Sequence, residues 1–296
     1  MNSKRVYFTR PTSSNGFARP SIMALMRCLR KDGWAISHEG RPPPPGSLAV
    51  GWGHVPHNRM LQRNGVRLLL LELGYIDRHN WYSLQFDGIC RTGLAPIPDD
   101  RGDRWKRVFD GHIKPWRDRP DGDIVIVGQI ETDANVQGHD IVQFYWDAAE
   151  KLRPFGRVVF RPHPSPRFRM PRLPDWLPIA GPGFTMKRFA EGAGVRRDLI
   201  DSFLDQARAV VTLSSNTAVE AVFAGVPTIA MSPRSMAWDV TSHTLDRLPE
   251  PVDRQDWFER LAWKQWTFEE IEDGTAWDTI KAGLDIPYHR NRFSDT

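Results

Sequence analysis

The sequence predicts an α/β fold with parallel sheets, because short apolar runs alternate with helical patterns along most of its 296 residues. Two such alternating stretches are separated by residues 92–122, which are rich in Pro, Gly and Asp and are typical of a domain connection. We therefore expect two Rossmann-like domains, residues 1–118 and 119–255, followed by a helical segment, residues 256–296.

The first domain contains four apolar runs that are expected to form strands, at residues 5–8, 34–37, 47–52 and 66–72. Between the first two runs, Pro20 opens a predicted helix, and Gly33 ends it. Apolar residues at positions 22, 25, 26 and 29 of this helix share one face.

The second domain repeats this alternation, with strands expected at residues 123–129, 157–160, 207–213 and 227–231. One helix is expected over residues 140–154. Another is expected to begin near Thr217, where Thr217 and Glu220 have the spacing of a capping box, and to end at Gly225.

The last segment carries four tryptophans at helical spacing, Trp257, Trp263, Trp266 and Trp277. We interpret them as the apolar faces of helices that pack on a core. Stacking of some of them on a sugar or a base is the alternative.

Composition indicates a globular protein, with 40% hydrophobic and 26% charged residues. The two cysteines, Cys28 and Cys90, are too few for a disulfide framework, so we expect a reducing cytoplasm. We expect no secretory signal, because the first residues contain no apolar h-region. We also expect no membrane insertion, because no apolar stretch reaches the roughly 20 residues that span a bilayer. A net charge of +4 is compatible with an anionic partner without requiring one.

The clearest chemical signal is the series Ser214, Ser215, Asn216 and Thr217, which lies between a predicted strand and a predicted helix. A helix N-terminus offers backbone N–H groups and a partial positive charge, and serine hydroxyls add further donors. This pattern predicts a phosphate site. The alternative, a simple helix cap, explains one of these residues but not four.

A second signal is "RPHP", in which Arg161 and His163 follow a predicted strand. Both side chains can donate hydrogen bonds to a phosphate, and the flanking Pro162 and Pro164 reduce the entropy that the loop loses on binding. A lone histidine is more often structural, and that alternative stays open.

A third strand end carries Gln129, Glu131 and Asp133. Taken alone these residues fit a polar loop with turn-forming residues. Because ligands of parallel α/β sheets bind at the carboxyl ends of the strands, they are also candidates to line a nucleotide pocket beside the other two strand ends.

In the first domain, Glu72 ends a very apolar strand, and Gly74 permits a tight turn after it. A carboxylate in this place can take a proton from an acceptor hydroxyl, whereas an ion pair with Arg78 is the alternative. His54 and His57 lie among glycine and proline without the spacing of metal ligands, so no metal site is expected.

Four segments in this order resemble the bacterial capsule-polysaccharide glycosyltransferases of the Kdo-transferase type, and more distantly bacterial sialyltransferases. The segments are "ELGYIDR" (72–78), "GQIETDAN" (128–135), "RPHP" (161–164) and "SSNTAVEAVFAGVP" (214–227). The resemblance implies a GT-B fold, in which two Rossmann-like domains face each other across a cleft. It also implies inverting transfer from a nucleotide-sugar, with no required metal.

The resemblance places the donor phosphate at His163 and the Ser214–Ser215 turn. The full set of expected donor-binding residues is Gln129, Asp133, Arg161, His163, Ser214, Ser215, Asn216, Thr217 and Glu220. The expected acceptor-binding residues are Asn15, Gly16, Arg78 and Trp81.

The catalytic residues are expected to be Glu72, Asp77 and His163. One departure from the family matters, because Leu73 occupies the position of the family's catalytic base in the E-D-G turn, and leucine cannot accept a proton. Glu72 is the favoured base, and Asp77 or a different activation of the acceptor are the alternatives. His163 and Arg161 would stabilise charge on the leaving phosphate.

The acceptor is the least determined part. The "E-x-G-Y" turn and the aromatic residues after it are also similar to small phage glycosyltransferases, so 5-hydroxymethylpyrimidine in double-stranded phage DNA is the first candidate, in a host cytoplasm. The basic residues that would face DNA are Arg101, Arg104, Lys106, Arg107, Lys114, Arg117 and Arg119, and a solvated linker face is the alternative.

A capsule or lipopolysaccharide acceptor, a nucleotide-sugar 2-epimerase and a binding module that has lost catalysis are the other hypotheses. The donor is expected to be a UDP-, GDP- or CMP-sugar, and the sequence leaves both its identity and the oligomeric state open.

Overall fold

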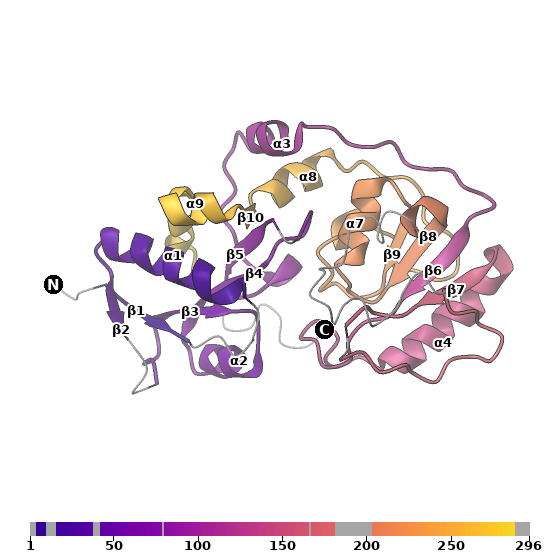
Figure 1. Cartoon of the computed structure of the whole chain (residues 1–296), viewed down its shortest axis with the longest axis horizontal. Coiled ribbons are helices and arrows are strands. Elements are labelled where there is room, and N and C mark those ends of the chain that lie inside the picture. The colour runs from indigo at the N-terminus through magenta and orange to yellow at the C-terminus, as the bar shows by residue number, and fades with distance from the viewer. Residues whose placement is uncertain are drawn as a thin grey trace. The chain divides into compact units, whose positions relative to one another are not determined.

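The computed structural model describes residues 4–9, 16–37, 42–78, 80–165, 167–180 and 203–287. The chain forms two compact units (Figure 1). Unit 1 comprises Met1–Gly111 together with Phe258–Thr296, and unit 2 comprises His112–Trp257. Each unit contains its own sheet.

The sheet of unit 1 has six strands in the order β10-β5-β4-β3-β1-β2. Four of them are parallel and lie where the sequence predicts strands: β1 (Arg5–Phe8), β2 (Ala35–Ser37), β3 (Leu48–Trp52) and β4 (Arg67–Leu73). Two strands were not predicted from the sequence, β5 (Tyr82–Phe86) and β10 (Gln265–Trp266), and both run antiparallel to their neighbours.

The helices of unit 1 are α1 (Ala18–Lys31), α2 (Pro56–Arg63), α3 (Gly102–Phe109), α9 (Phe268–Asp273) and α10 (Thr275–Ile280), while α8 (Gln255–Ala262) spans the boundary between the units. The predicted first helix is confirmed as α1, which begins at Ala18 rather than Pro20. Gly33 follows it with a φ of +81°, a conformation that favours glycine.

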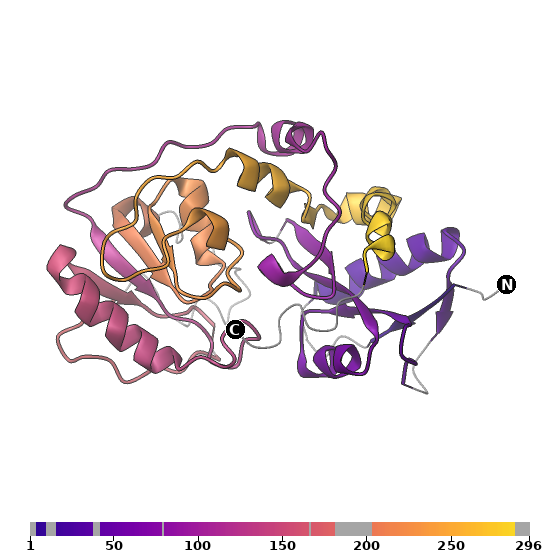
Figure 2. The same cartoon turned by 180° about the vertical axis from the view of Figure 1, so that it is seen from behind.

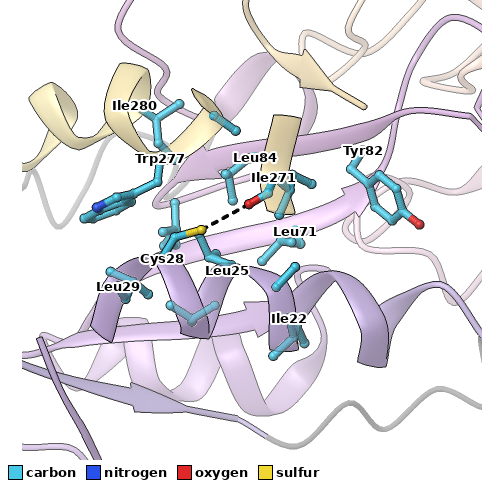
Figure 3. Close-up of a cluster of buried hydrophobic side chains, with 14 of the residues drawn as sticks. Ile22, Leu25, Cys28, Leu29, Leu71, Tyr82, Leu84, Ile271, Trp277 and Ile280 are labelled. Atoms are coloured by element: carbon cyan, nitrogen blue, oxygen red, sulfur yellow. Dashed lines mark hydrogen bonds between the residues drawn. The ribbon is translucent and has the colours of Figure 1, made fainter. Parts of the chain in front are cut away.

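The core of unit 1 is built from both ends of the chain. Leu25 and Cys28 of α1 pack in one cluster with Ile271 and Trp277 of the C-terminal segment, and the Cys28 thiol donates to the Ile271 carbonyl at 3.2 Å (Figure 3). Trp257, Trp266 and Trp277 are buried. The interpretation as core-facing helical residues is confirmed for Trp257 in α8 and Trp277 in α10, whereas Trp266 is a core residue of strand β10 and not of a helix.

Helix α3 lies inside the stretch that the sequence analysis took for a domain connection. Its Arg104 side chain is 1% exposed and forms a bidentate ion pair with Glu270 at 2.6 and 2.7 Å. The same guanidinium donates to the Ala262 and Gln265 carbonyls at 2.7 and 2.9 Å and lies over the Trp266 ring. Arg104 is therefore a core residue of unit 1, and its placement on a DNA-facing surface is wrong.

The sheet of unit 2 is fully parallel, with the order β7-β6-β8-β9. Its strands match the predicted ones: β6 (Asp123–Val127), β7 (Val158–Arg161), β8 (Ala207–Thr212) and β9 (Thr228–Ala230). Helix α4 (Ile141–Leu152) packs with Ile126 and Phe160 on one face, and α7 (Thr217–Ala224) packs with Val127 and Val210 on the other (Figure 2).

The predicted capping box of α7 is wrong. Its N-cap residue is Asn216, and no side-chain cap is present, so Thr217 and Glu220 belong to the helix itself. The predicted end of the helix is confirmed, since Gly225 takes a φ of +80° there. A Cβ at this glycine would also lie 2.2 Å from the Pro115 carbonyl oxygen.

The expected domain limits at 118/119 and 255/256 differ from the observed units. Residues from 112 onward belong to unit 2, because the Arg117 N–H donates to the Gly225 carbonyl at 2.7 Å and the Arg254 guanidinium donates to the Lys114 carbonyl at 2.5 Å. The expected third segment instead belongs to unit 1 from Phe258 onward, because its tryptophans fill that core.

Candidate functional site

The candidate donor residues lie at one edge of the unit 2 sheet. Since β7, β6 and β8 are parallel neighbours, their carboxyl ends meet there, followed by His163, Gln129 and Ser214. The loops that follow β6 and β7 are in direct contact. The Gly128 N–H donates to the Arg161 carbonyl at 2.8 Å, and a Cβ at Gly128 would lie 3.1 Å from the backbone nitrogen of His163.

Gln129 ties the ends of β6 and β8 together. Its Oε1 accepts from the Ser214 N–H at 2.8 Å and from the Thr212 hydroxyl at 2.9 Å, while its Nε2 donates to Ser214 Oγ at 3.2 Å. Its own N–H donates to the Tyr145 hydroxyl at 2.8 Å. All of these residues are buried, so this network fixes the turn that follows β8.

The turn before α7 differs from the expected array of open backbone donors. The N–H groups of Ser214, Ser215 and Thr217 already donate to Gln129 Oε1, to Thr212 Oγ1 and to Ser215 Oγ. The hydroxyls remain adaptable: Ser214 Oγ donates to the Asn135 carbonyl at 3.3 Å, and Ser215 Oγ donates to Thr217 Oγ1 at 3.2 Å. Because hydroxyls rotate, a phosphate is best reached here by side chains.

His163 is half-buried, and its ring orientation is fixed. Its Nδ1 accepts from the Ser165 N–H at 3.0 Å, and its ring lies tilted against Phe168 with 6.3 Å between the centroids. Since Nδ1 is an acceptor, the ring carries its proton on Nε2. That N–H is the donor that a phosphate oxygen requires.

Arg161 lies deeper than expected, at the end of β7 on the face covered by α7. It is 6% exposed, and its guanidinium stacks 4.3 Å above the Phe203 ring. Burial lowers the pKa of Arg161 to about 10, while the nearby Glu220 carboxylate raises it. Arg161 and Glu220 are thus electrostatic partners within unit 2.

Asp133, another predicted donor residue, lies on the surface, and its carboxylate is 3.9 Å from the Arg167 guanidinium.

A fourth strand end, after β9, was not predicted from the sequence to carry site residues. Ser232 and Arg234 follow β9 at the same edge, and Ser232 Oγ lies 3.3 Å from His139 Nε2. The signal was present, because "SPRS" comes directly after the predicted strand 227–231.

In unit 1, Glu72 lies near the end of β4, at the carboxyl edge of the parallel strands. Its Oε1 accepts from the Leu73 N–H at 3.0 Å, and a Cβ at Gly53 would lie 2.9 Å from its Oε2. The absence of a side chain at Gly53 thus gives the carboxylate its place beside the end of β3.

The turn after Glu72 holds the other candidates of unit 1. The Gly74 N–H donates to the Trp81 carbonyl at 2.7 Å, and a Cβ at Gly74 would lie only 2.5 Å from that of Trp81, so a larger residue does not fit. Asp77 has a φ of +51°, and its Oδ2 accepts from Asn80 at 2.9 Å. Arg78 is half-buried beside it.

The remaining acceptor candidates lie before α1. Gly16 is exposed, and Asn15 lies outside the described residues.

Gln265 is a further residue that the sequence analysis missed. It is fully buried in β10, and its Oε1 accepts from the N–H groups of Tyr75 and Ile76 at 2.9 and 3.1 Å. It therefore holds the turn that joins Glu72 to Asp77. No local pattern reveals a strand of two residues.

The side chains of the described ranges include no group of three or more His, Cys, Asp or Glu suited to a metal ion. In the same ranges, no helix has the length and apolar character needed to cross a bilayer.

No protein-family model and no curated protein matches the sequence. Among solved structures, KpsC β-Kdo 2,4-transferase from Thermosulfurimonas dismutans is similar over 90% of this chain and 93% of its own, with a TM-score of 0.54 and 15% identity. The β-Kdo 2,7-transferase of KpsC from the same organism matches over 92% and 98%, with a TM-score of 0.49 and 15% identity.

A UDP-GlcNAc 2-epimerase from Methanocaldococcus jannaschii matches over 87% of this chain and 97% of its own, with 11% identity, but its TM-score of 0.27 supports no inference. The similarity to the 2,4-transferase concerns the fold. Together with the two Rossmann-like units, it confirms the resemblance drawn from the four motifs: the chain has the α/β, GT-B-type fold of the Kdo transferases.

Proposed function

We propose that the protein is an inverting glycosyltransferase that moves a sugar from a nucleotide-sugar to an acceptor hydroxyl. The observation that carries this proposal is the meeting of Gln129, His163 and the Ser214–Ser215 turn at one sheet edge of unit 2. These residues supply neutral donors on a rigid frame, which suits a phosphate leaving group.

In the proposed reaction the acceptor oxygen attacks the anomeric carbon while the bond from that carbon to the phosphate oxygen breaks. Negative charge builds on the leaving phosphate, and His163 Nε2–H and the serine hydroxyls donate to it. The buried charge of Arg161 adds a favourable field from within unit 2. Glu72 takes the proton of the acceptor hydroxyl. The mechanism requires no metal, because these donors carry the developing charge.

For the acceptor, the structure leaves fewer basic side chains to DNA than the sequence predicts. Arg104 is buried, and Arg101 and Arg117 form ion pairs with Glu259 and Asp205. A glycan hydroxyl needs no basic stripe, and the solved structure of similar fold is named a Kdo transferase. We therefore propose a polysaccharide acceptor ahead of 5-hydroxymethylpyrimidine in DNA.

Binding and turnover with a panel of UDP-, GDP- and CMP-sugars test the proposal. A donor present at 100 times its dissociation constant should stabilise the protein by about 2.7 kcal/mol, which a thermal unfolding scan detects. Release of free nucleotide is then measured with a glycan acceptor, with hydroxymethylated DNA and with neither.

Each outcome decides between hypotheses. Release that depends on DNA would restore the DNA acceptor, and interconversion of sugars without any acceptor would indicate an epimerase. If no nucleotide-sugar raises the unfolding temperature, the donor site itself is wrong.

Replacing His163 with alanine should slow transfer by about 100- to 1,000-fold, because the leaving phosphate loses a positioned donor. His163→Asn is the matched control, since its amide oxygen can still accept from the Ser165 N–H but its amide nitrogen does not reach the position of Nε2. We expect both variants to be equally slow and to unfold like the wild type. Wild-type rates in His163→Asn would show that only the loop contact matters.

A further inference from the structure

The strand end after β9 extends the edge that carries the proposed donor site. The Met231 N–H donates to the Thr212 carbonyl at 3.0 Å, and the Ser232 N–H donates to the Leu213 carbonyl at 2.8 Å. The residues after β9 therefore continue the sheet beside the turn that begins at Ser214.

One loop, residues 130–139, links these two strand ends. The Asn135 carbonyl accepts from Ser214 Oγ at 3.3 Å, and the Gln137 carbonyl accepts from Arg234 Nη1 at 2.5 Å. Since two residues span at most about 7 Å, the Arg234 guanidinium lies no more than about 13 Å from Ser214 Oγ. The Arg234 cation is therefore close enough to the serine turn for one small ligand to contact both.

Arg234 is accompanied by two further polar groups. His139 Nε2 lies 3.3 Å from Ser232 Oγ, and Ser232 Oγ also accepts from the Arg234 N–H at 3.3 Å. Burial and the nearby Arg234 charge lower the pKa of His139, which shows that the two side chains share one electrostatic environment. We name Arg234, His139 and Ser232 the β9 cluster.

The β9 cluster has the chemistry of an anion site. A guanidinium presents five N–H donors in a planar fork that matches a phosphate or a carboxylate, and the contact with Gln137 engages one of its nitrogens. Neutral sugar hydroxyls do not need such a fork. The phosphate next to the leaving bond is already assigned to His163 and the serine turn, so a second negative group is the natural ligand.

We infer that the β9 cluster binds a second anionic group of the donor, with Arg234 as its principal contact. The inference rests on the proposed function, because it concerns the same donor site. Two sources have the required chemistry: the second phosphate of a nucleoside diphosphate, or the carboxylate of an acidic sugar joined to a nucleoside monophosphate.

Calorimetric binding to the full chain tests this inference in two arms. The first compares nucleoside diphosphates with monophosphates, UDP against UMP and GDP against GMP, and the second compares CMP-Kdo with CMP. In one of the two arms, the wild type should bind the ligand that carries the second anionic group more tightly than the corresponding nucleoside monophosphate. Arg234→Ala should remove that advantage, a loss of about 10- to 100-fold, and leave binding of the monophosphate within about twofold. Arg234→Lys should recover part of it, because the charge is kept and the fork is lost.

Arg157→Ala is the matched control. Arg157 is an exposed arginine directly before β7, at the opposite edge of the same sheet, and it pairs with Asp123, the first residue of β6. Its loss should change neither arm. The arm that responds to Arg234 identifies the source of the anion.

The outcomes separate the two proposals. If the wild type binds monophosphates but gains nothing from a second anion, or if Arg234→Ala weakens all ligands equally, the β9 cluster has no such role and the donor site stands. If the wild type binds none of these uridine, guanosine and cytidine nucleotides, the proposed function fails and this inference fails with it.

Discussion

Glu72→Gln should lower the rate of sugar transfer by about 100- to 10,000-fold, the range that a general base contributes. The substitution preserves shape, and the new amide oxygen can still accept from the Leu73 N–H. Donor binding should not change, because the carboxylate belongs to unit 1 and the donor residues to unit 2. The measurement is kcat with saturating donor, together with the donor dissociation constant.

Asp77→Asn separates the two candidate bases. Asparagine tolerates the φ of +51° at this position and keeps a side-chain oxygen for Asn80, so the turn should survive. We expect this variant to retain nearly full activity. The opposite result, an inactive Asp77→Asn and an active Glu72→Gln, would assign the proton to Asp77. Full activity in both would mean that neither carboxylate is the base.

Arg104→Ala should lower the free energy of unfolding of unit 1 by about 3–5 kcal/mol, as expected when one partner of a buried ion pair is removed. The change leaves Glu270 without its cation and leaves the Ala262 and Gln265 carbonyls without their donor. Urea unfolding measures the loss, and hydrogen exchange should locate it in residues 258–285.

Arg27→Ala is the control for this prediction. The Arg27–Glu272 pair also joins the two ends of the chain at 2.7 Å, but its side chains are 48% and 53% exposed. Such a pair contributes about 0–1 kcal/mol. Equal losses in both variants would show that the burial of Arg104 has no special effect.

Much of the fold could be predicted because parallel strands leave a strong local signal. β4, β6 and β8 are continuous apolar runs that are buried on both faces, and such runs stand out in any sequence. β10 has two residues and exists only through its pairing with β5, so no window of sequence contains it. Helix α3 was hidden because its inner face carries Arg104, a residue type that is almost never fully buried.

The candidate site likewise contains features that could be predicted from the sequence and features that could not. The rule that ligands meet the carboxyl ends of parallel strands was enough to bring Gln129, His163 and Ser214 together. It could not show that the N–H of Ser214 is already occupied, because the acceptor comes from Gln129, 85 residues earlier. Gln265 likewise reaches back 190 residues to Tyr75. Such partners follow from tertiary packing, which a local pattern does not record.

The divided composition of unit 1 has a consequence for synthesis on the ribosome. Trp266, Ile271 and Trp277 are translated after the whole of unit 2, yet they complete the core cluster that contains the buried residues of α1. Unit 2 is one uninterrupted stretch, so all of its residues are available for folding before the C-terminal residues of unit 1 have been translated. The usual order, in which the N-terminal domain matures first, is therefore reversed. During that interval we expect the apolar side of α1 to be exposed on the nascent chain, where chaperones can bind it.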